Sequence, residues 1–312
     1  RHTRFRNVTG VQTCALPIWP VVTTGGVVVV ADSLDEALDA VARHPDAVLL
    51  QGGTDVMVEV NIHHRRPASY VALRRVAELR RWHVDEDART VTIGAGVPYG
   101  DMEREPLRTL VPALAEAART VGSPQIRAAG SLGGNLGTCS PAGDGLPVLS
   151  ALDATVHLRS RDGARDVSVH DFMKGVKRND RRPGEIITAV TVPVVHGWQG
   201  YAKVGVRNAM VIAAASACLV VDRRPASGTA SARIALGAVG PTVIRCREAE
   251  AWLAGAADLR VGGVPAGVAR EFGRRVGLEA RPIDDHRSTA AYRRHAVSVL
   301  AERLLRRAGA AS

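Results

Sequence analysis

Four glycines fall within eight positions, at residues 130, 133, 134 and 137 of the run RAAGSLGGNLG. Glycine loses more backbone entropy on folding than any other residue, roughly 0.5–1 kcal/mol each relative to alanine. Close approach of bare backbone to a bulky phosphorylated cofactor offsets such a cost. Nearby polar side chains suit pyrophosphate, ribityl and ribose oxygens: Ser131, Asn135, Ser140 and Asp144. Structural turns without a ligand are the alternative for this segment in isolation.

A second glycine segment is the QGGTD run at residues 51–55, which follows an apolar strand predicted at 47–50. Adjacent glycines permit a tight turn and leave backbone N–H groups open to an anion such as a phosphate. A plain β-turn has the same pattern, and for a lone Gly-Gly pair it is the more common case. The glycines at 94, 96 and 100 miss the dinucleotide fingerprint by one residue, so we predict no Rossmann site there.

The charge balance raises the question of a nucleic-acid partner. The chain has 312 residues, with 41 basic against 31 acidic side chains and a formal net charge of +10. Almost all the basic residues are arginines spread along the chain, and aromatic residues make up only 4%, so few rings are available to stack on bases. We expect no nucleic-acid binding. No run approaches the roughly 20 apolar residues of a membrane-spanning helix, so we expect no membrane insertion.

Cysteines and histidines indicate no metal site. The cysteines form no Cys-x-x-Cys pair and no cluster at ligand spacing, and they lie far apart at Cys14, Cys139, Cys218 and Cys246. We interpret His63 and His64 as part of a solvated basic loop, because no ligand partners lie at suitable spacing. A chain of this length buries a core without disulfides, and we expect it to be cytoplasmic.

Hydrophobic periodicity predicts an α+β chain in two domains. Residues 33–36 read SLDE, a capping box that starts a helix with an apolar face. Strands are predicted at 27–31, 47–50, 69–73, 155–160, 186–193 and 232–239, and helices at 34–43, 111–121, 247–253, 267–276 and 288–307. In the last helix, Tyr292, Ala296, Leu300 and Leu304 are predicted to face the core with arginines outside. Residues 193–200 lack periodicity, and we interpret them as a linker at the domain boundary.

The chain begins unusually. Residues 1–22 start without Met and show no periodic pattern, and their VTGVQTCALPI run is similar to a translated sequencing adapter. We interpret these residues as a non-native or disordered leader.

Six blocks occur in a recognisable order: QGGTDV, RAAGSLGGNLGTCSPAGDGLPVLSALDA, PGEIITAVTVP, GYAKVGVRNAMVIAAASA, GAVGPTVIRCREAEAWL and STAAYRRHAVSVL. From about residue 27 to 307 the chain thereby resembles the FAD-binding medium subunit of molybdenum hydroxylases, the xanthine dehydrogenase and carbon monoxide dehydrogenase type enzymes. The resemblance implies a two-part FAD-binding domain of the vanillyl-alcohol-oxidase (PCMH) type over residues 23–195. A smaller α+β C-terminal domain would follow over residues 199–308.

The resemblance also implies which residues bind FAD. Two glycine loops would hold the pyrophosphate through backbone amides: Gln51, Gly52, Gly53, Thr54 and Asp55 in the first, and Ser131, Leu132, Gly133, Gly134 and Asn135 in the second. Asp144 would contact the sugar or ribityl part and Ile187 would lie near the flavin ring. Tyr201 and Lys203 would close over the isoalloxazine. Family members often have Asn where Ala128 stands and Thr in place of Ser131, so one side-chain amide is missing here.

The implied function is electron transfer, with FAD as cofactor and no catalytic side chain from this chain. Electrons would come from the [2Fe-2S] centres of a small subunit, fed by a molybdopterin large subunit, and pass through FAD to NAD+ or another acceptor. The chain would therefore be one subunit of a hetero-oligomer. Two alternatives share the fold: a stand-alone flavin reductase or oxidase, and a scaffold subunit without flavin.

Overall fold

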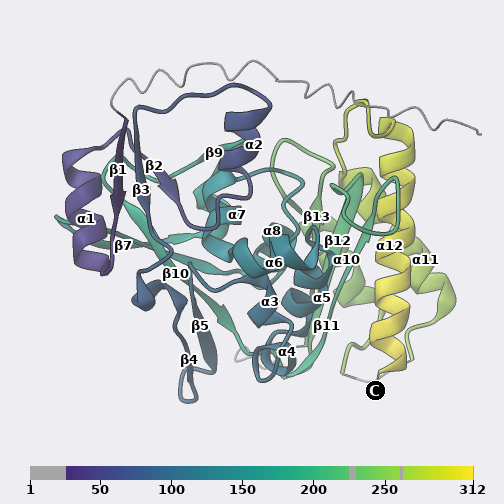
Figure 1. Cartoon of the computed structure of the whole chain (residues 1–312). Coiled ribbons are helices and arrows are strands. Elements are labelled where there is room, and N and C mark those ends of the chain that lie inside the picture. The colour runs from purple at the N-terminus through teal and green to yellow at the C-terminus, as the bar shows by residue number, and fades with distance from the viewer. Residues whose placement is uncertain (1–25, 225–229, 261–262, 312) are drawn as a thin grey trace, which may run out of the picture.

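The computed structural model describes residues 26–224, 230–260 and 263–311. A small parallel sheet with strand order β1-β3-β2 forms one end of the molecule (Figure 1), from β1 (Val27–Val30), β2 (Val48–Leu50) and β3 (Ser69–Ala72). Helix α1 (Leu34–Arg43) packs its apolar face into this part. As predicted, Ser33 caps α1 by accepting the Glu36 amide at 3.2 Å, while the Glu36 carboxylate accepts the amide of Asp32 rather than that of Ser33.

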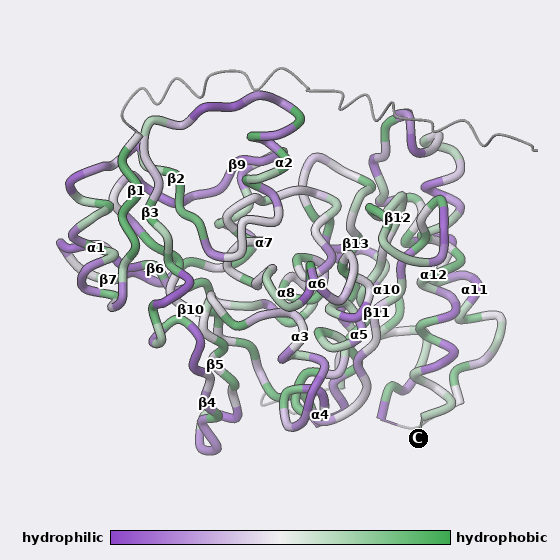
Figure 2. Tube along the Cα trace, viewed as in Figure 1, coloured by the Kyte–Doolittle hydropathy of each residue, from purple (hydrophilic) through white to green (hydrophobic). Residues whose placement is uncertain are grey.

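A five-stranded antiparallel sheet forms the middle of the molecule in the order β4-β5-β10-β6-β7. Its strands are β4 (Trp82–Asp85), β5 (Thr90–Gly94), β6 (Thr155–Ser160), β7 (Gly163–Ser168) and β10 (Ile186–Pro193). Alternate residues of β5, β6 and β10 are buried, as the period-2 pattern predicts. The hydrophilic turn between β4 and β5 projects from the body of the molecule (Figure 2).

Six short helices lie between β5 and β6 in the sequence. Their apolar side chains pack against those of the five-stranded sheet in the main core. The helices are α3 (Tyr99–Met102), α4 (Leu107–Leu110), α5 (Pro112–Thr120), α6 (Pro124–Ala129), α7 (Leu132–Thr138) and α8 (Gly145–Ala151). The remaining elements of this domain are α2 (Val56–Asn61), the 3₁₀ helix η1 (Ala77–Arg80), α9 (Val169–Phe172), β8 (Met173–Gly175) and β9 (Arg178–Asn179). The glycine-rich run at 130–137 is thus mostly helical.

The C-terminal domain is a four-stranded antiparallel sheet covered by three helices (Figure 1). Its elements are β11 (Gly197–Val204), β12 (Ala215–Asp222), β13 (Ser231–Gly237), β14 (Ile244–Arg245), α10 (Arg247–Ala256), α11 (Ala266–Glu279) and α12 (Ala290–Ala310). One face of the sheet packs on α5 and α8 of the first domain, and the other face packs on the three helices. Strand β12 is buried along its whole length because both faces are covered.

Three expectations need correction. The predicted linker at 193–200 is mostly strand, because β10 ends at Pro193 and β11 begins at Gly197. Tyr292 is 50% exposed, since the first turn of α12 extends beyond the core that Ala296 and Leu300 enter. Arg293, expected on the outside, is buried because its guanidinium donates to the Ala238 carbonyl and pairs with Asp285. The predicted leader and Cys14 lie outside the described residues. Among the described helices, none is both long and apolar enough to cross a bilayer.

Candidate functional site

The first glycine segment, residues 51–55, is a turn at the end of β2 with unused backbone donors. Gly53 has φ of +72°, a left-handed conformation that glycine adopts without strain. A Cβ on Gly52 would overlap the carbonyl oxygen of Ala129, so the turn is pressed against the end of α6. Within the described part of the chain, the amides of Gly52, Gly53 and Thr54 donate no hydrogen bond. These donors suit an anion.

The second glycine segment differs from the expected loop because it forms the first turns of α7. Ser131 is the N-cap, and its Oγ accepts the Gly134 amide at 3.1 Å. The Gly133 amide donates to the Ala95 carbonyl at 2.8 Å, and the Asn135 amide donates to the Ser131 carbonyl at 3.0 Å. Three of the amides expected to bind pyrophosphate here, those of Gly133, Gly134 and Asn135, therefore have partners inside the protein.

Packing explains why this helix contains glycine. A Cβ on Gly133 would lie 2.5 Å from the Cβ of Ala95, so only glycine lets α7 reach the turn after β5. At Gly134 the nearest atom to a Cβ would be Ser131 Oγ at 3.4 Å, and at Gly137 nothing lies within 4 Å. Gly134 and Gly137 are also exposed. The open surface over these two positions is available to a ligand.

The structure brings the two glycine segments together, although more than 70 residues separate them. Thr138, the last residue of α7, donates from Oγ1 to Asp55 Oδ2 at 2.6 Å. Thr54 Oγ1 lies 3.5 Å from the position of a Cβ on Gly130. Asp55 is the N-cap of α2, so the start of α2 meets the end of α7. The free amides of the first turn and the open surface of α7 therefore belong to one site.

Three buried polar atoms near the two segments have no hydrogen-bond partner among the described residues: Gln51 Oε1, Tyr99 OH and Asn135 Oδ1. An unpaired buried polar group costs about 1–3 kcal/mol, so such atoms indicate a missing ligand or bridging water. The Tyr99 hydroxyl and the Asn135 oxygen both lie close to Gly145, at 3.2 and 3.0 Å from where its Cβ would be. The residues present therefore fit a polar ligand such as a dinucleotide.

Sequence reasoning missed Tyr99. Burial raises the pKa of its hydroxyl well above the usual range, and the charges of Asp144 and Asp55 raise it further. The phenol therefore stays protonated and is available as a donor between the two glycine segments. No sequence signal distinguishes this tyrosine from an ordinary core residue at the start of a short helix.

Asp144, Tyr201 and Lys203 form one buried contact between the domains. Asp144 accepts the Tyr201 hydroxyl at 2.7 Å through Oδ1 and Lys203 Nζ at 2.8 Å through Oδ2. Lys203 Nζ also donates to the Thr120 carbonyl at 2.9 Å, and its side chain is 7% exposed. Burial raises the pKa of Asp144, while Lys203 and Tyr201 oppose that rise. The three predicted residues are thus brought together, and they join α8 to β11.

The remaining predicted residues take less polar places. Leu132 is fully buried in the main core, and Ile187 lies in the same core on β10, where the register shifts between Ile187 and Ala189. Ser140 Oγ accepts the Ala142 amide at 3.4 Å. Among the described residues, no group of three or more His, Cys, Asp or Glu side chains is placed to hold a metal ion. The site thus offers donors, acceptors and an apolar strand to a ligand.

Two family models match the chain. The FAD binding domain in molybdopterin dehydrogenase matches residues 23–195, and the CO dehydrogenase flavoprotein C-terminal domain matches residues 201–308. Among curated proteins, the nicotinate dehydrogenase FAD-subunit of Eubacterium barkeri is 34% identical, over 72% of this chain and 78% of that one. The glyceraldehyde dehydrogenase medium chain of Sulfolobus acidocaldarius is 31% identical, over 86% of this chain and 93% of that one.

Solved structures share the fold over about nine tenths of the chain. Quinoline 2-oxidoreductase from Pseudomonas putida 86 superimposes with a TM-score of 0.81 at 25% identity, covering 91% of this chain and 97% of that one. Carbon monoxide dehydrogenase from Hydrogenophaga pseudoflava gives a TM-score of 0.79 at 27% identity, covering 92% of this chain and 97% of that one. Both domains and their mutual packing are therefore shared with these structures.

Proposed function

The chain belongs to the FAD-binding medium-subunit family of the molybdenum hydroxylases, and on that premise we propose that it carries electrons from a partner subunit to an external acceptor. It is an oxidoreductase subunit with FAD as its cofactor. We infer that the electrons come from [2Fe-2S] centres of a small subunit, which a molybdopterin large subunit reduces. The acceptor in this proposal is NAD+ or another electron acceptor.

One observation carries the proposal: backbone amides without acceptors and buried side-chain oxygens without partners lie close together where the two glycine segments meet. The amides of Gly52, Gly53 and Thr54 would bind the diphosphate, and Asn135 and Gln51 would accept from ligand hydroxyls. Ser131 and the occupied amides of α7 would hold the helix that presents this surface. Bound FAD supplies the exchange of one or two electrons.

The other predicted residues would shape the flavin end of the site. Ile187 offers an aliphatic side chain from β10, next to the shifted register. Asp144 has both carboxylate oxygens engaged by Tyr201 and Lys203, so these two residues would fix the carboxylate that faces the sugar or ribityl part. We assign Tyr201 and Lys203 the role of closing the site by holding the second domain in place.

Titration with FAD tests this proposal. The purified full chain is expected to show the visible absorption of an oxidised flavin and to quench FAD fluorescence. Gly133→Val is expected to lose the cofactor because the new side chain collides with Ala95. Gly255→Ala, on α10 of the C-terminal domain, meets nothing within 4 Å and should bind FAD as wild type. A folded wild-type chain that neither retains nor titrates FAD would contradict the proposal and favour a scaffold subunit.

The electron path needs the native complex. After anaerobic reduction of the complex through its large subunit, addition of NAD+ should reoxidise the flavin if NAD+ is the acceptor. Isolation of an active lone chain from the native host would instead favour a stand-alone reductase or oxidase.

A further inference from the structure

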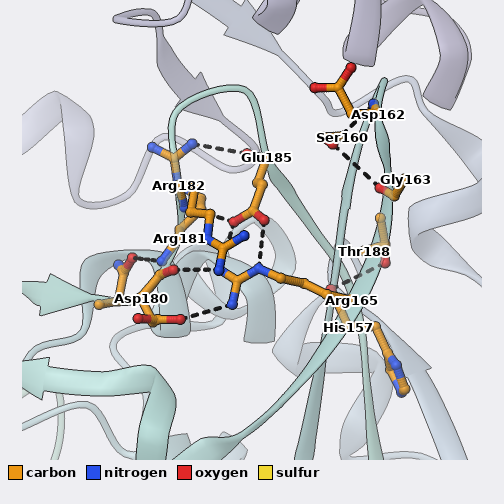
Figure 3. Close-up of polar contacts among 11 residues, drawn as sticks. His157, Ser160, Asp162, Gly163, Arg165, Asp180, Arg181, Arg182, Glu185 and Thr188 are labelled. Atoms are coloured by element: carbon orange, nitrogen blue, oxygen red, sulfur yellow. Dashed lines mark hydrogen bonds and ion pairs between the residues drawn. The ribbon is translucent and has the colours of Figure 1, made fainter.

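Arg165 on β7 binds two acidic residues, buried Glu185 and partly exposed Asp180 (Figure 3). Its Nε and Nη2 donate to the two carboxylate oxygens of Glu185 at 2.6 and 2.8 Å. Its Nη1 donates to Asp180 Oδ2 at 2.8 Å, and Nη2 also reaches the Asp180 carbonyl at 2.6 Å. Glu185 is 6% exposed. Charge-assisted, bidentate bonds of this kind are among the strongest that side chains make.

Further hydrogen bonds link Glu185 to the residues just before it in the segment 180–185. Glu185 accepts the Arg182 amide at 2.7 Å through Oε2, and its carbonyl accepts from Arg181 Nη1 at 2.9 Å, as Figure 3 shows. Arg165 holds the pKa of Asp180 below its usual range. For Glu185, burial raises the pKa, but Arg165 and the Arg182 amide outweigh it and the net direction is downward. Both carboxylates are thus stabilised as anions.

Hydrogen bonds link the C-terminal end of this segment to the first turn of α7. Strand β10 begins directly after Glu185, and its register shift leaves Thr188 out of the ladder with β6. The Thr188 carbonyl accepts the Ala95 amide at 2.9 Å, and the Ala95 carbonyl accepts the Gly133 amide at 2.8 Å. A continuous path of backbone hydrogen bonds therefore connects β10 to the start of the helix.

Hydrogen bonds of the residues just before this segment link its N-terminal end to the last turn of α7. Asn179, which precedes Asp180, donates from Nδ2 to the Gly137 carbonyl at 2.8 Å. The Lys177 amide donates to the Cys139 carbonyl at 3.1 Å, at the C-cap of α7. The two acidic residues that one guanidinium holds are thus joined to opposite ends of the glycine helix.

We propose that Arg165 is a positioning residue for the FAD site, which fixes both ends of α7 and so sets Asn135 against the first glycine segment. The inference rests on the proposed function. It requires arginine rather than any cation, because a lysine ammonium cannot bind two carboxylates with a planar fork. The positive charge alone is therefore not sufficient.

The test compares Arg165→Lys with Arg161→Gln in the full chain. Arg161 lies on the turn of the same hairpin and pairs with Asp39 at 2.5 Å, but it is 48% exposed and does not touch residues 180–185. Arg165→Lys is expected to weaken FAD binding about tenfold by fluorescence titration and to change the visible circular dichroism of the bound flavin. Arg161→Gln should leave both unchanged.

A second control separates positioning from general loss of stability. Leu304→Ala creates a cavity in the C-terminal core, far from α7, and should lower the thermal unfolding temperature at least as much as Arg165→Lys. It is expected to keep the wild-type FAD affinity and flavin spectrum. Equal effects of Leu304→Ala and Arg165→Lys on FAD, or no effect of Arg165→Lys, would overturn the inference alone. A wild-type chain without FAD binding would overturn the proposed function and this inference with it.

Discussion

The two glycine segments look alike in sequence and use glycine for opposite reasons. In residues 51–55, Gly53 takes a left-handed conformation, and the amides of Gly52, Gly53 and Thr54 have no acceptor among the described residues. In α7 the amides of Gly133, Gly134 and Asn135 have partners, and Gly133 serves to bring the helix onto Ala95. The first segment therefore presents backbone to a ligand, while the second places a helix surface and its side chains beside it. The number of glycines does not distinguish these two roles. The hydrogen-bond partners of the backbone amides distinguish them.

Gly52→Ala is expected to have the largest effect, because the first segment is also packed tightly at one point. The new methyl group overlaps the Ala129 carbonyl, and backbone cannot move aside as a flexible side chain can. We expect a loss of about 4 kcal/mol or more in the free energy of unfolding, measured by urea denaturation. A loss below about 1 kcal/mol would show that the turn is free to shift away from α6.

Lys203→Met is expected to come next, because it leaves the Asp144 carboxylate buried without its cation. Through this pair the C-terminal domain supports α8, which packs on α7 of the second segment. We expect a loss of about 3 kcal/mol in unfolding free energy. The double variant Lys203→Met with Asp144→Asn should recover part of that loss. If the double variant is no more stable than Lys203→Met, the buried pair is not the source of the effect.

Gly134→Ala is expected to change stability in the opposite direction. Position 134 lies in α7 with open space around it, so alanine should raise the unfolding free energy by roughly 0.5–1 kcal/mol. If FAD lies over this surface, the added methyl group should weaken FAD binding while the protein becomes more stable. Thermal unfolding and FAD titration on the same preparation check both signs. Unchanged affinity would place the cofactor away from Gly134.

Acid is expected to have the smallest effect, and it acts on the support of α7. Asp180 and Glu185 have pKa values below the ordinary 3.8 and 4.5, so their ionised forms stabilise the fold above those values. That contribution is lost as the pH falls through the lowered pKa values. Urea unfolding of wild type and Arg165→Gln at several pH values should therefore show a stability difference that shrinks below about pH 4.5. A difference that stays constant would argue against the Arg165 contacts as its source.

Local signals predicted most of the fold. The capping residues Ser33 and Glu36 and the alternating strands β6 and β10 depend on neighbours in sequence, and they appear as expected. Ser131 is equally a local cap signal, but the glycines after it favoured a loop, since glycine disfavours helix. What permits the helix is Ala95, 38 residues earlier, a contact that local pattern does not encode.

Long-range chemistry in the site was accessible only through the family resemblance. Asp144 and Lys203 are 59 residues apart, and nothing in composition or periodicity indicates that they pair. Tyr99 and Arg165 were not predicted at all. A buried tyrosine and a strand arginine are ordinary residues until their partners are known, or until a partner is seen to be missing.

The sheet of the C-terminal domain has a practical consequence for anyone who wishes to move the flavin module into another complex. Tyr201, Cys218 and Val220 belong to the same apolar core as α5 and α8. A fragment cut at the domain boundary would expose that face to water and invite aggregation. Grafting experiments and gene fusions should therefore transfer both domains as a single cassette, with the junctions placed outside them.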